Sequence, residues 1–310
     1  MKVQQISEQV SIPDPVVTIG TFDGVHLGHR FILDALRERA AEIGGSSVVV
    51  TLWPHPRIVL DKDLWNFRLL HSREEKIRKL AELGIDYLLI IPFTPEVAGL
   101  SACEFVSEYL VKTFRMKELM IGYDNRFGKD RKGDPEGLAH CSRINGFSIS
   151  KLPEFTGSGL KVNSTSIRER LLAGDLPAAT AMLGYDYYLT GKVVDGHRIG
   201  RTIGFPTANV HPLDPYKLIP PDGVYAVQLD HRGTTYTGML NIGYRPTIDS
   251  ASPVKTIEVH LFDFEGDLYG EEVTIHFRKR IRNEMKFSGI DELRKQLETD
   301  RETVKRLIYK

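Results

Sequence analysis

The chain has 310 residues, which is enough for two compact domains. Its 41 Lys and Arg residues balance its 41 Asp and Glu residues, so the chain has no overall positive field that would attract nucleic acid or an anionic membrane. Hydrophobic residues make up 41% of the chain and charged residues 26%, which is typical of a folded globular protein. Any phosphate-binding site in this chain must therefore be local.

The two cysteines, Cys103 and Cys141, form neither a C-x-x-C pair nor a cluster with histidine. This excludes a disulfide scaffold and a structural zinc site as the organising principle of the fold. The amino terminus has no apolar signal core, and no stretch approaches the ~18 apolar residues that a transmembrane helix needs. We therefore expect a cytoplasmic protein with no membrane partner.

The first 185 or so residues alternate short apolar runs with helical periodicity, which predicts a parallel sheet flanked by helices. The expected strands are residues 16–19, 48–52, 87–91 and 119–121, and the expected helices are residues 30–43, 73–83 and 102–114. Ser72 with Glu75, and Ser101 with Glu104, have the spacing of a capping box. A long polar loop is expected from Gly122 to Gly137.

The pattern changes after Gly184. Period-two runs such as residues 223–229 and 256–262, separated by turn-forming residues, predict antiparallel strands. These strands favour a small barrel or sandwich, and residues 291–308 predict a closing helix. The fold class is therefore α/β followed by all-β, with one domain over residues 1–184 and a second over residues 185–310.

A glycine- and histidine-rich segment, GTFDGVHLGHR at residues 20–30, lies between the first predicted strand and the first predicted helix. In an open α/β sheet, ligands bind beyond the carboxyl ends of the strands, and the start of a helix offers free N–H groups to phosphate. His26 and His29 lie on one side of this helix start and can both donate hydrogen bonds, while Gly28 allows a nucleotide to approach the backbone. The alternative is that both histidines only cap the helix.

This segment resembles the nucleotidyltransferase superfamily with the HxGH signature, and more closely the adenylyltransferase half of the bacterial bifunctional riboflavin kinase/FMN adenylyltransferases. Further matches follow in order: TLWPHP at 51–56, SREEK at 72–76, GYDNRFG at 122–128 and NSTSIRERL at 163–171. The resemblance implies a Rossmann-like nucleotidyltransferase domain. It also implies a reaction that transfers the adenylyl group of ATP to FMN, giving FAD and pyrophosphate, with Mg²⁺ bridging the phosphates.

The resemblance implies that His26, His29 and Arg168 are catalytic residues that contact the phosphates of ATP. It implies ATP binding by residues of the two phosphate motifs, namely Gly20, Phe22, Asp23, Gly24, Ser164 and Thr165, and flavin binding by Asp124 and Phe127. Without the resemblance, Ser164 and Arg168 would be explained by a helix cap and a surface arginine.

Three positions depart from the family pattern. Asn163 stands where Ser is commoner, Ser166 where Arg is commoner, and Asn125 where an aromatic residue is commoner. The first two bear on phosphate affinity and the third on how the flavin ring is held, and none of them removes a residue that the chemistry requires. Residues 54–56, Pro-His-Pro, either line the flavin pocket or form a rigid loop after a strand.

A second segment, residues 191–209, interleaves glycines with basic residues, which is typical of a loop whose backbone N–H groups approach phosphate. Composition alone leaves a hairpin loop as an equal alternative. The run GRTIGFPTAN resembles the riboflavin kinase signature, and the resemblance continues through GVYA at 223–226, NIGYRPT at 241–247, Glu258 and LYG at 268–270. It implies a small antiparallel riboflavin kinase β-barrel with a carboxy-terminal helix.

Carried over by residue, the kinase resemblance makes Thr207 and Asn209 the ligands of Mg²⁺ and ATP, because both offer neutral oxygen donors. It makes Glu258 the general base that takes a proton from the ribityl hydroxyl of riboflavin. The positions implied to bind ATP are Gly191, Gly200, Arg201 and Gly204. Sequence pattern alone would place Glu258 on the solvent face of a strand.

We therefore expect a bifunctional enzyme that converts riboflavin and ATP to FMN, and then FMN and ATP to FAD, with Mg²⁺ in both steps. An aminoacyl-tRNA synthetase also uses an HxGH element, but this chain has no K-M-S-K-S partner and no basic excess, so no nucleic-acid partner is expected. The other alternative keeps FMN adenylyltransferase and makes the β domain a non-catalytic flavin-sensing module. Thr207, Asn209 and Glu258 together argue against it. The sequence predicts no oligomeric state.

Overall fold

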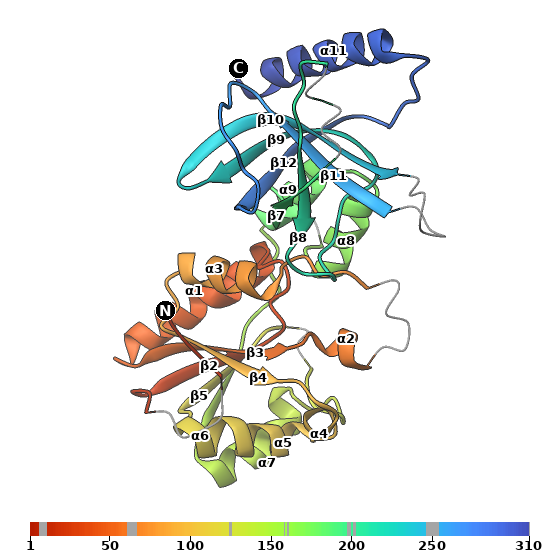
Figure 1. Cartoon of the computed structure of the whole chain (residues 1–310). Helices are drawn as coiled ribbons and strands as arrows, with labels where there is room; N and C mark the ends of the chain where they lie inside the picture. Colours follow the sequence, from red (N-terminus) through yellow and green to blue (C-terminus); the bar gives the residue numbers. More distant parts are fainter. Residues whose placement is uncertain are drawn as a thin grey trace. The chain divides into compact units, whose positions relative to one another are not determined.

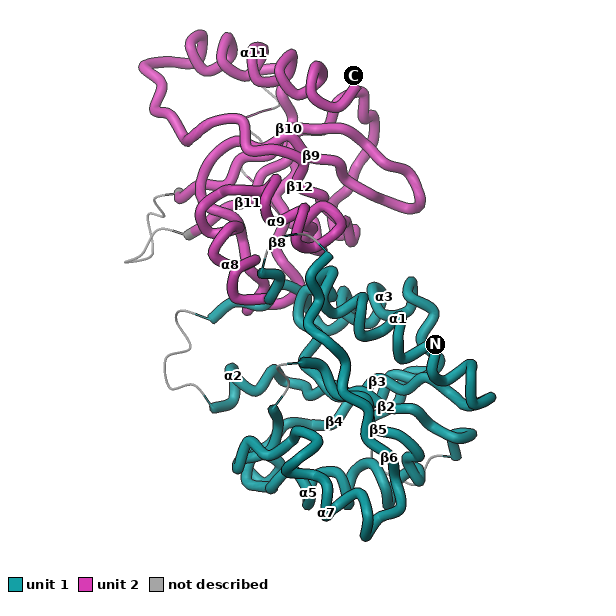
Figure 2. Tube along the Cα trace, turned by 180° about the vertical axis from the view of Figure 1, so that it is seen from behind, with its two compact units in different colours: residues 1–163 teal, residues 164–310 magenta. Residues whose placement is uncertain are grey.

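The computed structural model describes residues 1–5, 11–60, 67–123, 126–157, 159, 161–196, 200, 203–245 and 254–309. The chain separates into two compact units, residues 1–163 and residues 164–310 (Figure 2). Each unit has its own sheet, and each is described by itself.

The first unit is built on a six-stranded parallel sheet with the strand order β1-β4-β3-β2-β5-β6. The strands are β1 (Lys2–Gln5), β2 (Pro15–Ile19), β3 (Ser46–Trp53), β4 (Tyr87–Pro92), β5 (Glu118–Ile121) and β6 (Ser148–Lys151). The helices are α1 (Leu27–Glu42), α2 (Pro56–Leu60), α3 (Arg73–Glu82), α4 (Pro95–Ala98), α5 (Ala102–Phe105), the π-helix η1 (Val106–Val111), α6 (Lys112–Phe114) and α7 (Pro135–Asn145). The predicted α/β class of this half is confirmed.

Helices cover both faces of this sheet, with α1 and α3 on one side and α5 and α7 on the other (Figure 1). Successive residues of a strand point to opposite faces, so a strand covered on both sides is apolar throughout. In β2, Val17 packs in the cluster that contains Phe105 of α5, and its neighbour Val16 packs in the cluster that contains Leu36 of α1. The loop of residues 20–26 begins directly after Ile19, at the carboxyl end of β2.

Several elements of this unit differ from the sequence prediction, and the short helices α2 and α4 were not predicted. Strands β1 and β6 were not expected because their sequences, KVQQ and SISK, are polar and lie at the sheet edges. Helix α7 begins at Pro135, inside the predicted loop, with Asp134 as its N-cap. The helix expected over residues 102–114 is present, but its middle turn is the π-helix η1. Both predicted capping boxes, at Ser72 and at Ser101, are confirmed.

A disulfide bond joins Cys103 of α5 to Cys141 of α7. The two cysteines are 38 residues apart in the sequence, and no local pattern indicated that they would meet. The fold brings them together because α5 and α7 pack on the same face of the sheet. The bond links two helices that already share a hydrophobic cluster, so it supports this face of the unit and does not organise the fold.

The second unit contains a closed barrel with the strand order β10-β11-β8-β7-β12-β9 and antiparallel pairing. The strands are β7 (Tyr188–Val194), β8 (Ala208–Pro212), β9 (Gly223–His231), β10 (Thr234–Arg245), β11 (Val254–Leu261) and β12 (Glu272–Arg282). Helices α8 (Ser164–Leu172) and α9 (Leu176–Leu183) precede the barrel, and α11 (Ile290–Ile308) follows it. The predicted antiparallel barrel and closing helix are both confirmed.

Helix α11 packs on the barrel through an apolar face and one buried ion pair. Leu297 and Val304 of α11 pack in a cluster with Phe262. Asp300, which is 1% exposed, accepts hydrogen bonds from the guanidinium of Arg282 on β12, the shortest of them 2.7 Å. An Arg–carboxylate pair with two parallel hydrogen bonds fixes orientation as well as distance. The helix is thereby held in one position on β12.

Helices α8 and α9 belong to the second compact unit, although the predicted domain boundary follows them at residue 184. Helix α9 packs on β12 of the barrel. Compactness and function need not divide a chain at the same residue, and the functional boundary at 184 stays a prediction. Across the described ranges, no helix combines the length and apolar character needed to span a bilayer.

Candidate active sites

The first candidate site is the loop of residues 20–26, which joins the carboxyl end of β2 to α1. Phe22, Gly24 and Val25 in this loop have positive φ angles of 46°, 88° and 35°. For the β-branched Val25 this conformation is rare, and complete burial of the side chain holds it in place. Gly20 lies close to the ring of Phe22, because a Cβ there would be 3.0 Å from a ring carbon. Backbone strain of this kind is typical of functional loops.

Asp23 fastens this loop to the segment that precedes α3. Its carboxylate is 1% exposed and accepts hydrogen bonds from the backbone N–H groups of Leu70, at 3.1 Å, and His71, at 3.0 Å. The contact brings the start of α3 beside the histidine loop. The structure therefore gives Asp23 a positioning contact, and the predicted contacts of Gly20, Phe22, Asp23 and Gly24 with ATP stay predictions.

The structure brings the two predicted histidines into contact. His26 is the N-cap of α1, and its Nδ1 accepts a hydrogen bond from the backbone N–H of His29 at 3.2 Å. Because Nδ1 is the acceptor, the proton of the neutral ring lies on Nε2. The His29 ring stacks on the His26 ring with centroids 3.6 Å apart and planes at 14°. Helix capping, the alternative role, thus uses only one nitrogen of one ring.

His29 is a neutral hydrogen-bonding group at pH 7. Burial lowers the pKa of His29 well below its ordinary value, and electrostatic interactions with His26, Lys76 and His71 lower it further. Its Nδ1 is buried without a hydrogen-bond partner among the residues described. A triphosphate at this position would supply both an acceptor and compensating negative charge.

Lys76 of α3 is a residue of this site to which the sequence analysis assigned no role. Its side chain is 2% exposed, and the ammonium lies 5.3 Å from the centroid of the Trp53 ring. Burial lowers the pKa of Lys76 to about 8, against the opposing effect of the negative charge of Asp23. One sequence signal could have found it: Lys76 precedes Leu80 by four residues, which puts it on the apolar face of the helix.

The second predicted phosphate motif of this reaction belongs to the other compact unit. Ser164 and Thr165 are the first residues of α8, and Arg168 follows one turn later. The structure does not unite them with His26 and His29 in one unit, so their joint contact with ATP stays a prediction.

The two predicted flavin-binding residues have separate outcomes. Asp124 lies outside the described residues. Phe127 packs edge-on against Phe105, with ring centroids 5.8 Å apart. This contact belongs to the core under α5, and the flavin contact of Phe127 stays a prediction.

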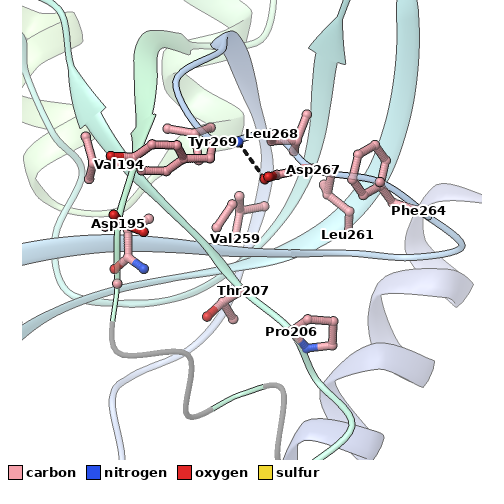
Figure 3. A pocket seen from close by; sticks show the side chains of 15 residues that line it. Val194, Asp195, Pro206, Thr207, Val259, Leu261, Phe264, Asp267, Leu268 and Tyr269 are labelled. Carbon is pink, nitrogen blue, oxygen red and sulfur yellow. Dashed lines mark hydrogen bonds between the residues drawn. The ribbon is translucent and has the colours of Figure 1, made fainter.

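The second candidate site is a pocket of about 480 Å³ in the barrel unit, lined by residues of β7, β8, β11 and the loop before β12. Figure 3 shows Leu268 and Tyr269 along one side of this pocket and Pro206 and Thr207 along the other. The loop is shaped by a hydrogen bond from the backbone N–H of Tyr269 to Oδ1 of Asp267, at 2.9 Å. The volume lies in the range of small-molecule sites.

Two residues predicted for riboflavin phosphorylation line this pocket, and the third, Glu258, contacts one of them. Thr207 and Asn209 line it, and Asn209 stands directly opposite Glu258 in the pairing of β8 with β11. The Thr207 hydroxyl donates a hydrogen bond of 3.4 Å to Oε2 of Glu258, across 51 positions of sequence. The hydroxyl of Thr207 and the amide of Asn209 therefore lie in the wall of the pocket, and the carboxylate of Glu258 lies within hydrogen-bond distance of that hydroxyl.

Two glycines of the 191–209 segment leave room for these groups. A Cβ on Gly196 would lie 1.9 Å from Nδ2 of Asn209, and a Cβ on Gly200 would lie 2.1 Å from the carbonyl oxygen of Phe205. The first clash would displace the side-chain amide of Asn209, and the second would displace the backbone at Phe205, two residues before Thr207. Close packing therefore explains the residue type here.

The other predicted ATP-binding positions of this segment are placed differently. Gly191 lies within β7, where a Cβ would be 2.5 Å from Cγ1 of Val210 on β8, so strand packing already requires glycine. Gly204 has a positive φ of 84°, as a turn requires. Arg201 lies outside the described residues. Contacts of all these positions with ATP stay predictions.

The donors at this pocket fit Mg²⁺ bound together with ATP. The hydroxyl of Thr207 and the amide oxygen of Asn209 are hard, neutral oxygen donors on one wall, and Mg²⁺ takes its other ligands from phosphate and water. The described residues hold no group of three or more His, Cys, Asp or Glu side chains placed to bind a metal.

Comparison with known proteins agrees with this division into two sites. The sequence model of the FAD synthetase family matches residues 9–166, and that of the riboflavin kinase family matches residues 183–308. These matches define a two-part transferase of flavin nucleotides. The kinase match favours a catalytic second unit over the flavin-sensing alternative.

Similarity to curated proteins extends over nearly the whole chain. The bifunctional riboflavin kinase/FMN adenylyltransferase of Escherichia coli (strain K12) is 41% identical over 291 residues, which cover 94% of this chain and 91% of that relative. The protein of the same description from Bacillus subtilis (strain 168) is 38% identical over 295 residues, covering 93% and 90%. The chain belongs to the family of bifunctional riboflavin kinase/FMN adenylyltransferases.

A solved structure that is similar over nearly the whole chain shows the same fold. It is described as a macrolide-efflux protein from Streptococcus pneumoniae, is 33% identical, covers 98% of both chains and gives a TM-score of 0.87. The description concerns that protein, whereas the similarity concerns the fold.

Proposed function

We propose that the two activities of this family are carried out at the two sites described above. FMN adenylyltransferase activity belongs to the site around His26 and His29, and riboflavin kinase activity to the pocket around Thr207, Asn209 and Glu258. The observation that carries the kinase assignment is the contact of Glu258 with Thr207 beside the paired Asn209. The stacked histidine pair at the start of α1 carries the other.

In the kinase reaction, the ribityl hydroxyl oxygen of riboflavin attacks the γ-phosphorus of ATP, and the bond from that phosphorus to the β,γ-bridging oxygen breaks, which releases ADP. The nucleophile is neutral and must lose a proton, which the Glu258 carboxylate accepts. Thr207 donates a hydrogen bond to that carboxylate and keeps its lone pairs for a cation. Thr207 and Asn209 would hold Mg²⁺, which when bound neutralises charge on the phosphates.

In the adenylyl transfer, a phosphate oxygen of FMN attacks the α-phosphorus of ATP, and the bond to the α,β-bridging oxygen breaks, which releases pyrophosphate. The nucleophile is already an anion, so the protein needs to position the groups and neutralise charge. His26 and His29 donate ring N–H groups to phosphate oxygens, and the start of α1 adds backbone N–H groups. Ser164, Thr165 and Arg168 at the start of α8 are further candidates for phosphate binding, as the family resemblance implies.

The test is an incubation of the protein with ATP and Mg²⁺ and either riboflavin or FMN, followed by chromatography of the flavins. Glu258→Gln is expected to lower FMN formation by about 10²–10⁴-fold, the usual contribution of a general base, and to leave FAD formation from added FMN unchanged. His29→Ala is expected to show the reverse pattern. Equal loss of both reactions in a folded Glu258→Gln protein would contradict the assignment to two sites.

A further inference from the structure

Helix α3 places a buried cation at the first site. The side chain of Lys76 is 2% exposed, and within the described part of the chain its Nζ has no hydrogen-bond partner. Its ammonium lies 5.3 Å from the centroid of the Trp53 ring. A cation–π contact replaces only part of the hydration that a buried ammonium loses. Burial of such a group lowers the stability of the folded protein, which suggests that the group has a functional role.

Three observations place this ammonium beside the histidine pair. Asp23, in the histidine loop, binds the backbone of residues 70–71, from which α3 follows. The charge of Lys76 acts on His29, and the charge of Asp23 acts on Lys76. Trp53 ends β3, which is the parallel neighbour of β2, so ring and loop lie at the same edge of the sheet.

The charges around Lys76 favour an anion. Asp23 is the carboxylate that acts on it, and this group already accepts hydrogen bonds from two backbone N–H groups. The other titratable side chains of the cluster are the bases His26, His29 and His71. Two buried polar atoms, Nζ of Lys76 and Nδ1 of His29, lack hydrogen-bond partners among the described residues. A phosphate group is the ligand that would satisfy both.

We propose that Lys76 is a further phosphate-binding residue of the adenylyl-transfer site, whose ammonium donates a hydrogen bond to a phosphate oxygen of ATP or FMN. This inference rests on the proposed function of the first unit. Negative charge moves onto the α,β-bridging oxygen as its bond to the α-phosphorus breaks, and a fixed buried cation stabilises that charge better than water does. Lys76 keeps its proton throughout the step.

The rival role for Lys76 is structural, as the counter-ion of Asp23. The two roles predict different effects on stability. Removing a structural counter-ion leaves the buried carboxylate of Asp23 uncompensated and lowers the thermal midpoint, whereas removing a cation that the fold buries at a cost leaves the midpoint unchanged or raises it.

The test compares Lys76→Met with Lys79→Met in the full chain. Methionine keeps the length of the side chain and removes the charge. Lys79 lies three residues further along α3, in an ion pair of 2.8 Å with the exposed Glu82. For each variant, kcat and KM of FAD formation are measured for ATP and FMN separately, together with riboflavin phosphorylation and the thermal midpoint.

Lys76→Met is expected to lower kcat/KM of FAD formation by about 10²-fold or more, while riboflavin phosphorylation is retained and the thermal midpoint does not fall. Lys79→Met is expected to match the wild type. A rise in KM for ATP identifies an ATP phosphate as the ligand, and a rise in KM for FMN identifies the FMN phosphate. If Lys76→Met does not fold, Lys76→Gln replaces it, and Lys76→Arg is expected to retain more activity than Lys76→Gln.

Unchanged FAD formation in Lys76→Met or Lys76→Gln would overturn the inference, as would a loss accompanied by a lowered thermal midpoint and an equal loss of riboflavin phosphorylation. Absence of FAD formation in the wild type would instead contradict the proposed function itself, so the two failures are distinguishable.

Discussion

Burial lowers the pKa of both Lys76 and His29 below its ordinary value. For Lys76 the pKa falls from 10.5 to about 8, which corresponds to about 3 kcal/mol at ~1.4 kcal/mol for each tenfold change. Below pH 8 the ammonium is charged in both the folded and the unfolded chain, so the folded state bears this full cost. Between pH 8 and 10.5 the unfolded chain holds a proton that the folded chain lacks, so the unfolding free energy rises with pH.

The rise of the unfolding free energy with pH gives a prediction at the residue scale. Lys76→Met is expected to be more stable than the wild type at pH 7, and the difference is expected to shrink as the pH rises towards 10. The measurement is urea unfolding of both proteins at a series of pH values, with Lys79→Met as the control. A difference that does not change with pH would contradict burial of a charged Lys76.

A second prediction at this scale concerns Gly196, which leaves room for the amide of Asn209. Gly196→Ala would put a Cβ 1.9 Å from Nδ2 of Asn209, so the amide must move. We expect riboflavin phosphorylation to fall by about 10²-fold, as misplacement of a binding group by ~1 Å can do, with FAD formation from FMN retained. Gly289→Ala is the matched control, because a Cβ there meets no atom within 4 Å among the described residues. Retention of full kinase activity in Gly196→Ala would contradict the role of Asn209.

At the scale of elements, the start of α3 decides where Lys76 lies. Ser72 accepts a hydrogen bond from the backbone N–H of Glu75, and the Glu75 carboxylate accepts one from the backbone N–H of Ser72. Both bonds are buried, whereas the same device at Ser101, the N-cap of α5, is exposed. A buried N–H group that loses its acceptor cannot form a hydrogen bond with water in its place.

The two capping boxes therefore make a matched pair of variants. Ser101→Ala is expected to lower the unfolding free energy by about 1 kcal/mol, which is usual for loss of an N-cap. Ser72→Ala is expected to cost more, in the range of about 1–3 kcal/mol for a buried group left without a partner. Urea unfolding of the two variants measures the difference, and equal costs would show that burial of the α3 cap has no energetic consequence.

On the scale of the whole molecule, each compact unit contains its own sheet, and the two proposed sites use different phosphorus atoms of ATP. The product of the second unit, FMN, is the substrate of the first. Nothing in the chemistry of either step requires both sites to belong to the same copy of the chain, because each step consumes its own molecule of ATP.

A mixture of two variants, each lacking one of the two activities, tests this independence. Glu258→Gln is expected to make very little FAD from riboflavin because its FMN formation is about 10²–10⁴-fold slower, and His29→Ala is expected to stop at FMN. Mixed in equal amounts with riboflavin, ATP and Mg²⁺, the two are expected to form FAD at a rate that rises with protein concentration. FMN that accumulates without FAD in the mixture would show that the intermediate must pass within one chain.

Much of the fold followed from local sequence. The strands at 16–19 and 48–52 and the closing helix at 291–308 are present in β2, β3 and α11, because apolar periodicity and capping spacing are properties of a few consecutive residues. The edge strands β1 and β6 escaped prediction because polar, half-exposed strands carry no such pattern. They form only because the neighbouring strands β4 and β5 offer unpaired backbone groups.

The sequence by itself determined the two units' classes, the histidine loop at the end of β2 and, through family resemblance, the residues of the kinase pocket. Only the tertiary structure decided that Thr207 reaches Glu258 across 51 positions, that Cys103 meets Cys141, and that Lys76 lies buried over Trp53 near Asp23. Local pattern fixes the element in which a side chain sits. Its neighbours, its burial and therefore its charge state depend on strand order and helix packing, which join residues far apart in the chain.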